Sequence, residues 1–309
     1  MFISEDQVRK HLTYAALIPA LRQALIDYSA GLVDQPPRSI LRAGNAAGVN
    51  NGWFAVMPVI AGDVMAVKTV TFYPGNAVLG IPTHLATVQL LRRSTGESLA
   101  IMDGRLITEM RTAAVSAVAF AALSLLHFQT APRSLGILGS GVQAHAHVDA
   151  LRHVWPELAE IRIWSPTSAH AERLAAQTGA CAVSIEEAAS AEVVLAATSA
   201  AKPVLQGKWL APNALVLAVG ATGASLRELD DDVMHSSFVV AESRSCVERE
   251  SGDVRLSGAT VSAEIGEILA RPAAASIPRD RRVLFKSVGM AIEDLTAARI
   301  VWQAIAQSV

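Results

Sequence analysis

A glycine turn between an apolar run and a helical pattern constrains the fold of this chain more than any other stretch. Residues 135–138 are apolar, residues 139–144 read G-x-G-x-x-A, and apolar residues then recur at helical spacing over 142–154. Strand, glycine turn and helix in this order are the setting in which the fingerprint binds a dinucleotide, with the pyrophosphate at the helix N-terminus. The alternative is an ordinary tight turn without a ligand.

The stretch that begins with this turn alternates between strand and helix patterns as far as residue 286. Such alternation predicts an α/β Rossmann domain, a doubly wound parallel sheet with helices on both faces, which we assign to residues 116–290. The predicted strands are 135–138, 161–164, 180–183, 193–197, 215–219, 237–240 and 282–286. The predicted helices are 142–154, 168–178, 186–190 and 261–270.

The remaining residues predict a second, α+β domain formed by 1–115 and completed by a C-terminal helix within 291–309. A helical pattern covers 4–31 and is expected to break into two helices near Pro19. A long alanine-rich helix over 105–127 then crosses into the Rossmann domain. The β-rich part between them has an extended stretch at 35–43, a hairpin tip at 44–52, and strands at 53–59, 64–73, 84–91 and 98–102. Their pairing is either antiparallel or mixed.

Composition narrows the class of protein. The net charge is −2, so nothing indicates nucleic-acid binding. The two cysteines, Cys181 and Cys246, are too few for a disulfide framework or a metal cluster, and we expect no metal site. We see no signal peptide and no uncharged apolar run of about 18 residues, so we expect a cytoplasmic protein that does not enter a membrane.

The residues after the second predicted Rossmann strand bear on which dinucleotide binds. An Asp or Glu at this place holds the ribose hydroxyls of NAD, but here Ser165, Pro166, Thr167 and Ser168 follow Trp164. These hydroxyl groups tolerate a 2′-phosphate, which a carboxylate would repel. We therefore predict that NADPH is preferred over NADH. The alternative is that the residues only cap the next helix.

Eight stretches in order along the chain resemble one family, the ornithine cyclodeaminase/mu-crystallin family, and the resemblance is greatest to its ketimine reductase branch. They are RSI (38–40), VKTVTFY (67–73), IMDG (101–104), TEMRTAAVSA (108–117), ILGSGVQ (137–143), RELDDD (227–232), ESGDV (250–254) and FKSVGM (285–290). The resemblance implies a homodimer, an N-terminal substrate-binding and dimerisation domain, and chemistry on cyclic imines of amino acids.

Together the fingerprint and the resemblance give a set of predicted cofactor contacts. They are Thr112, Gly139, Ser140, Gly141, Val142, Gln143, Ser165, Pro166, Thr167, Thr198, Ser287 and Gly289.

The predicted substrate site consists of cations in apolar surroundings. Lys68 lies inside a predicted strand, where a lysine is costly unless it is paired; an edge strand is the alternative. The planar fork of Arg111 suits a carboxylate, and the resemblance gives both residues to the active site. It also matches Arg38 to a carboxylate-binding position, with Arg42 as a weaker candidate. His84 either faces the pocket or is a hydrogen-bonded structural histidine.

One departure separates members of the family. Cyclodeaminases carry an aspartate shortly after the fifth Rossmann strand, whereas Thr222 stands there in this chain. A hydroxyl group is a poor general base near neutral pH, so the resemblance favours an imine reductase. We expect Δ1-pyrroline-2-carboxylate and Δ1-piperideine-2-carboxylate to be reduced to L-proline and L-pipecolate, with Lys68, Thr222 or a water handling the nitrogen proton.

The alternatives are ornithine cyclodeaminase, an alanine or N-alkyl amino acid dehydrogenase, and a non-catalytic NADPH-dependent binder of small ligands.

Overall fold

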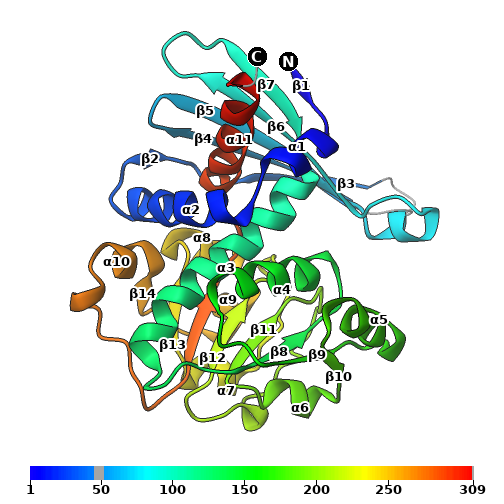
Figure 1. Cartoon of the computed structure of the whole chain (residues 1–309), viewed down its shortest axis with the longest axis vertical. Coiled ribbons are helices and arrows are strands. Elements are labelled where there is room, and N and C mark those ends of the chain that lie inside the picture. Colours follow the sequence, from blue (N-terminus) through cyan, green and yellow to red (C-terminus); the bar gives the residue numbers. More distant parts are fainter. Residues whose placement is uncertain (45–51, 308–309) are drawn as a thin grey trace. The chain divides into compact units, whose positions relative to one another are not determined.

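The computed structural model describes residues 1–44 and 52–307. The chain divides into two compact units, one made of Met1–Arg111 with Met290–Val309 and the other of Thr112–Gly289 (Figure 1). These bounds differ by a few residues from those expected from the sequence. The first unit combines two segments that are far apart in the sequence, because the C-terminal helix packs with the N-terminal segment.

The first unit is built on a mixed sheet. Its strands are β1 (Phe2–Ile3), β2 (Val33–Asp34), β3 (Ser39–Ala43), β4 (Gly52–Ala61), β5 (Val64–Phe72), β6 (His84–Arg92) and β7 (Ser98–Asp103). They lie in the order β1-β7-β6-β5-β4-β2, with β3 also paired to β4. The pair β1–β7 is parallel and the others are antiparallel. The predicted hairpin tip falls mostly on residues 45–51, outside the described residues; beside it Ala43 pairs with Gly52.

The prediction that the first helical segment breaks near Pro19 is wrong. Helix α1 (Glu5–His11) ends at Leu12, and the Thr13 side chain accepts a hydrogen bond from the Ala16 N–H as the N-cap of α2 (Tyr14–Ser29). Pro19 lies inside α2. The helix keeps Leu17 and Leu21 buried on one face, and this packing together with the Thr13 cap outweighs the hydrogen bond that a proline removes.

Helix α11 (Ala291–Ala306) packs on one face of this sheet, against β4, β5 and β6 (Figure 1). Alternate residues of β5 point to that face, namely Val64, Ala66, Lys68 and Val70, and all four are buried. Three of them are apolar, as a strand covered by a helix requires. Lys68 is the exception, and it marks the position of the site described below.

The second unit confirms the predicted Rossmann fold. Its strands are β8 (Ser134–Leu138), β9 (Glu160–Trp164), β10 (Cys181–Ala182), β11 (Val193–Ala196), β12 (Leu215–Ala218), β13 (Phe238–Ala241), β14 (Ala263–Glu264) and β15 (Val283–Lys286). They form one parallel sheet in the order β10-β9-β8-β11-β12-β15-β13-β14. The order reverses between β8 and β11, and ligands of such sheets bind outside the carboxyl ends of the strands at this point.

Helices cover this sheet. They are α3 (Arg105–His127, which begins in the first unit), α4 (Val142–Val154), α5 (Ser168–Thr178), α6 (Ile185–Ala189), α7 (Asp231–Ser236), α8 (Arg244–Glu250), α9 (Gly252–Ser257) and α10 (Ile265–Ala270). Sequence patterns did not reveal α7, α8 and α9, since helices of this length show barely two turns of periodicity, although the predicted helix over 186–190 matches the shorter α6. The predicted helix over 261–270 is wrong in its first part: Ala263–Glu264 pairs with β13 as β14, and the helix starts after it.

Among the described residues, α3 is long and apolar enough to cross a membrane by length and composition. However, 72% of its most apolar window is buried inside the protein, as in the core helix of a folded domain.

Candidate active site

Lys68 lies on β5, between β4 and β6, so it is not on an edge strand. Its side chain is 2% exposed, and Nζ lies 2.6 Å from Oδ2 of Asp294 in α11. A buried ammonium group is tolerated only when it is paired, and the first turn of α11 supplies the partner. The helix dipole favours a carboxylate at this end of a helix.

Arg111 shares this partner. Its Nε lies 3.3 Å from Asp294 Oδ1, and its Nη1 lies 2.6 Å from Glu293 Oε2. The cluster therefore contains four buried charged groups, two cations and two carboxylates, and all four belong to the first unit. Two nitrogens of the guanidinium fork that was predicted to bind a substrate carboxylate already contact carboxylates of the protein.

Burial and neighbouring charges change the titration of this cluster. Burial lowers the pKa of Lys68 to about 8; Asp294 opposes this decrease, and the positive charge of Arg111 adds to it. Burial also lowers the pKa of His84 to about 4, and the charges of Lys68 and Arg111 lower it further. At neutral pH His84 is therefore uncharged, whereas Lys68 can gain or lose a proton close to physiological pH.

A third cation, Arg38, acts on the same cluster. Arg38 lies half-buried before β3, close enough for its charge to lower the pKa of Lys68. Lys68 and Arg111 contact the carboxylates of Glu293 and Asp294, and the positive charge of Arg38 acts on the same cluster. Three cations gathered in one part of the first unit suit a ligand that carries a carboxylate. Arg42, in contrast, is exposed on β3.

Sequence reasoning missed Glu293 and Asp294. The signal was present in the sequence, because two acidic residues stand in the first turn of a largely apolar C-terminal helix. Both are buried, at 0% and 1% exposed. A sequence pattern predicts which residues are buried. It does not predict which distant cations neutralise two buried carboxylates.

The glycine turn of the second unit has the geometry that a dinucleotide needs. Gly139 has φ +123°, and a Cβ there would collide with the carbonyl oxygen of Ala197. Gly141 is the N-cap of α4, and no described atom lies within 4 Å of where its Cβ would be. The buried Oε1 of Gln143 has no hydrogen-bond partner among the described residues. The open backbone at the helix N-terminus fits a phosphate, and the unused Gln143 oxygen fits a donor group, such as a hydroxyl, on the same ligand.

The end of β9 has hydroxyl groups where an NAD-binding acid would stand. Ser140 donates a hydrogen bond from its hydroxyl to the Ser165 hydroxyl at 2.9 Å, and Ser165 is buried. Pro166 and Thr167 are exposed. Thr167 is the N-cap of α5, but its side chain makes no capping hydrogen bond, so capping alone does not explain this residue.

The other predicted cofactor contacts lie at several places in the second unit. Thr112 is buried in α3, and Val142 is exposed at the start of α4. The Thr198 N–H, after β11, donates to Glu228 Oε1 at 2.5 Å. The Ser287 hydroxyl donates to Glu242 Oε2 at 2.6 Å, and the Gly289 N–H donates to Glu242 Oε1. The last two therefore already have a carboxylate partner in the protein.

Thr222 is exposed in the loop after β12, and it forms a β-bridge with Ser251. It belongs to the second unit, and Lys68 belongs to the first.

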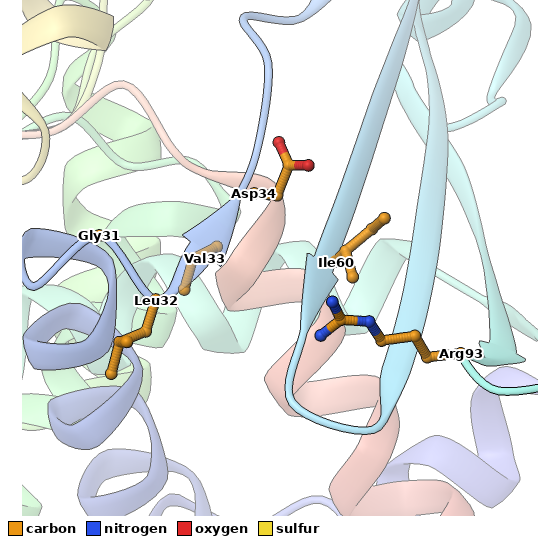
Figure 2. A pocket seen from close by; sticks show the side chains of 6 residues that line it. All are labelled: Gly31, Leu32, Val33, Asp34, Ile60 and Arg93. Carbon is orange, nitrogen blue, oxygen red and sulfur yellow. The ribbon is translucent and has the colours of Figure 1, made fainter.

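A separate cavity of about 340 Å³ lies in the first unit near the end of α2 (Figure 2). It is lined by Gly31, Leu32, Val33, Asp34, Ile60 and Arg93. None of the predicted site residues lines it, and the Arg93 side chain donates a hydrogen bond to the Gly62 carbonyl.

Comparison with known proteins matches this architecture over nearly the whole chain. Ketimine reductase mu-crystallin of Rattus norvegicus is 39% identical over 315 residues, covering 97% of this chain and 96% of the relative. A Delta(1)-pyrroline-2-carboxylate/Delta(1)-piperideine-2-carboxylate reductase of Azospirillum brasilense is 33% identical over 303 residues, covering 96% and 93%.

Solved structures give the same result. The Thermococcus litoralis Delta(1)-pyrroline-2-carboxylate reductase in complex with NADH and L-proline superposes with a TM-score of 0.90 at 29% identity, covering 100% of this chain and 98% of that one. The model of the ornithine cyclodeaminase/mu-crystallin family matches residues 1–308. The chain therefore belongs to the ornithine cyclodeaminase/mu-crystallin family.

Proposed function

We propose that this protein is an NAD(P)H-dependent imine reductase that converts Δ1-pyrroline-2-carboxylate and Δ1-piperideine-2-carboxylate to L-proline and L-pipecolate. The observation that carries the proposal is the cluster of buried cations, Lys68 and Arg111, with the charge of Arg38 acting on Lys68. A cyclic imino acid presents one carboxylate beside the carbon–nitrogen double bond. The names of the relatives and the Thr222 position support a reductase over a cyclodeaminase.

The chain's own residues would bind and orient the substrate and supply a proton. Arg38, Lys68 and Arg111 hold the carboxylate, which fixes the imine carbon in place for reduction. When bound, the nicotinamide supplies a hydride to that carbon. Lys68, with a pKa of about 8, is protonated at neutral pH and provides the proton that the nitrogen gains overall. His84, whose pKa of about 4 keeps it neutral, adds no further charge to the cluster.

We further propose that NADPH is preferred over NADH. The residues directly after β9 include no carboxylate, and the hydroxyl groups of Ser165 and Thr167 would tolerate a 2′-phosphate there. The residues of the glycine turn, Gly139–Gly141 with Gln143, would hold the pyrophosphate. The expected cytoplasmic location belongs to the same proposal.

The proposed assembly is a homodimer formed through the sheet face opposite α11. On that face Phe2, Leu85 and Ile101 are 65%, 41% and 42% exposed. Phe2 pairs with Ile101, and Ile101 pairs with Gln89, so these side chains belong to one continuous face. An exposed apolar sheet face of this kind is typical of a protein interface, and a second copy offers the same face.

A steady-state assay tests the function. Oxidation of NADPH and of NADH is measured with the five-membered and the six-membered imine, with an imine-free control and with ammonia release from L-ornithine measured in parallel. Imine-dependent oxidation with kcat/KM higher for NADPH is expected. Absence of imine-dependent oxidation, with cofactor binding retained, would identify a non-catalytic binder instead.

A further inference from the structure

Three of the stretches that resemble the family meet in one buried network of the second unit. Glu228 belongs to 227–232, Asp253 to 250–254 and Lys286 to 285–290. All three side chains are 0% exposed. Burial of ionisable groups is costly unless they are paired and hydrogen-bonded, so the contacts of this network decide what it does.

One ion pair connects the end of β15 with two other segments. Lys286 Nζ lies 2.9 Å from Asp253 Oδ2, and it donates a hydrogen bond to the Gly220 carbonyl at 3.0 Å. Asp253 Oδ1 accepts hydrogen bonds from the backbone N–H groups of Glu228 at 2.8 Å and of Leu229 at 3.0 Å. The pair thus holds the start of the loop that follows β12 and also its end.

The same loop is confined from the side of β11. Glu228 Oε1 accepts a hydrogen bond from the Thr198 N–H, and the Ala221 N–H donates to the Thr198 carbonyl at 3.1 Å. A Cβ at Gly220 would collide with both the Thr198 carbonyl and the Glu228 carboxyl group. The backbone of the loop is therefore packed directly against the network, with no space for a larger residue.

The loop carries backbone strain immediately before Thr222. Ala221 has φ +48°, and it is the one non-glycine residue with positive φ in the described part of the chain. A residue with a Cβ persists in this conformation only where its surroundings enforce it, and such strain is concentrated at functional sites. Thr222 and Gly223 then pair with Ser251, two residues before Asp253.

We propose that Lys286 and Asp253 are positioning residues for Thr222. Their ion pair fixes the Gly220 carbonyl, holds Ala221 in the left-handed conformation and thereby sets the direction of the Thr222 hydroxyl in the reduction. Both side chains are fully buried, so they act through the loop. This inference rests on the proposed function, because it gives Thr222 a place in that reaction.

The test variant removes both partners of the ion pair together, and leaves in the network Glu228, whose pKa is raised by burial toward the neutral form. In the double variant Lys286→Met/Asp253→Asn the charges of both side chains are lost. The asparagine amide oxygen can still accept the hydrogen bonds from the backbone N–H groups of Glu228 and Leu229. The matched control is Arg282→Met at the other end of β15. Arg282 pairs with Asp232 at 3.3 Å and donates to the Gly207 carbonyl at 2.6 Å, with no contact to the loop.

Four quantities are measured for each protein: kcat, KM for the imine, Kd for NADPH by fluorescence, and amide hydrogen exchange of the peptide that covers 219–224. For the double variant we expect kcat to fall about 10- to 100-fold while KM and Kd change by less than about threefold. Exchange should accelerate in 219–224 alone. Arg282→Met should lower the unfolding temperature but leave kcat per folded molecule within about twofold of the wild type.

The outcomes separate this inference from the proposed function. If the wild type reduces no imine, the proposed function fails, and unchanged exchange in 219–224 would overturn the placement of the loop as well. If the wild type is active and the double variant keeps its kcat, or loses it only in proportion to unfolded protein as the control does, the positioning role is refuted.

If the double variant does not fold, Lys286→Gln decides, because its amide keeps a donor in the site but is shorter than lysine and lacks the charge that pairs with Asp253, so it holds the Gly220 carbonyl less firmly. It should lower kcat at least about threefold at unchanged KM; wild-type kcat in this variant would overturn the inference.

Discussion

The lowered pKa of Lys68 predicts a basic limb in the pH profile of kcat/KM. With a pKa of about 8, the ammonium form makes up about nine-tenths of the free protein at pH 7 and about one-tenth at pH 9. The charged form both attracts the carboxylate and supplies the proton, so activity should be present below this pKa and lost as the pH rises through it. Between pH 7 and 9, kcat/KM should therefore fall about tenfold.

The assay is imine reduction at saturating NADPH from pH 6 to 10. A bound carboxylate adds negative charge beside Lys68 and raises its pKa, so the limb in kcat should appear at higher pH than the limb in kcat/KM. Replacement of His84 by Asn should leave the limb in place, because the low pKa of His84 keeps it neutral throughout this range.

The decisive control is Lys68→Arg, since an arginine keeps its positive charge over the whole range. Its activity should be lower because the guanidinium group is larger and is a poor acid, but its profile should lack the limb near pH 8. The imine substrate also titrates, and a limb caused by the substrate would persist unchanged in the variant. A limb at the same pH in Lys68→Arg would therefore refute the assignment to Lys68.

Four further substitutions test other parts of the molecule. Ser165→Asp should shift the ratio of kcat/KM values toward NADH by at least about tenfold, because its carboxylate would repel the 2′-phosphate; an unchanged ratio would place that phosphate elsewhere. The native protein should release no ammonia from L-ornithine, and Thr222→Asp should not raise imine reduction; robust ammonia release would show that Thr222 does not mark the reductase branch. Gly136→Ala should lower the free energy of unfolding by about 1–3 kcal/mol or more in urea titrations, since its Cβ would overlap the Ala188 carbonyl, whereas Gly141→Ala should weaken NADPH binding at nearly unchanged stability.

The features that the sequence predicts correctly are those set by residues close to one another in the chain. The turn at 139–144 is recognisable because its glycines have a fixed spacing and stand between a strand and a helix, and the structure confirms both neighbours. Lys68 is recognisable because a charge interrupts a buried strand. The start of α2 was misjudged because the Thr13 cap, and not Pro19, sets it.

The partners of the predicted cations could not be predicted, because they are distant in the sequence. Asp294 and Lys68 are 226 residues apart, as 294 − 68 gives, and only the three-dimensional packing of α11 on β5 brings them together. The same holds for Lys286, Asp253 and Glu228, which come from three separate stretches. A single sequence shows that a buried charge needs a partner, but it does not show which one.

The place of α11 also sets an order on folding during synthesis. The carboxylates that neutralise Lys68 and Arg111 lie in the last twenty residues of the chain, so they leave the ribosome after every strand of the first sheet and after the entire second unit. Until then Lys68 and Arg111 lack the two carboxylates that contact them, whereas all the described strands of the second unit have already emerged. We therefore expect the first unit to complete its packing last, and the apolar face of its sheet to be exposed to chaperones and proteases until α11 has been made.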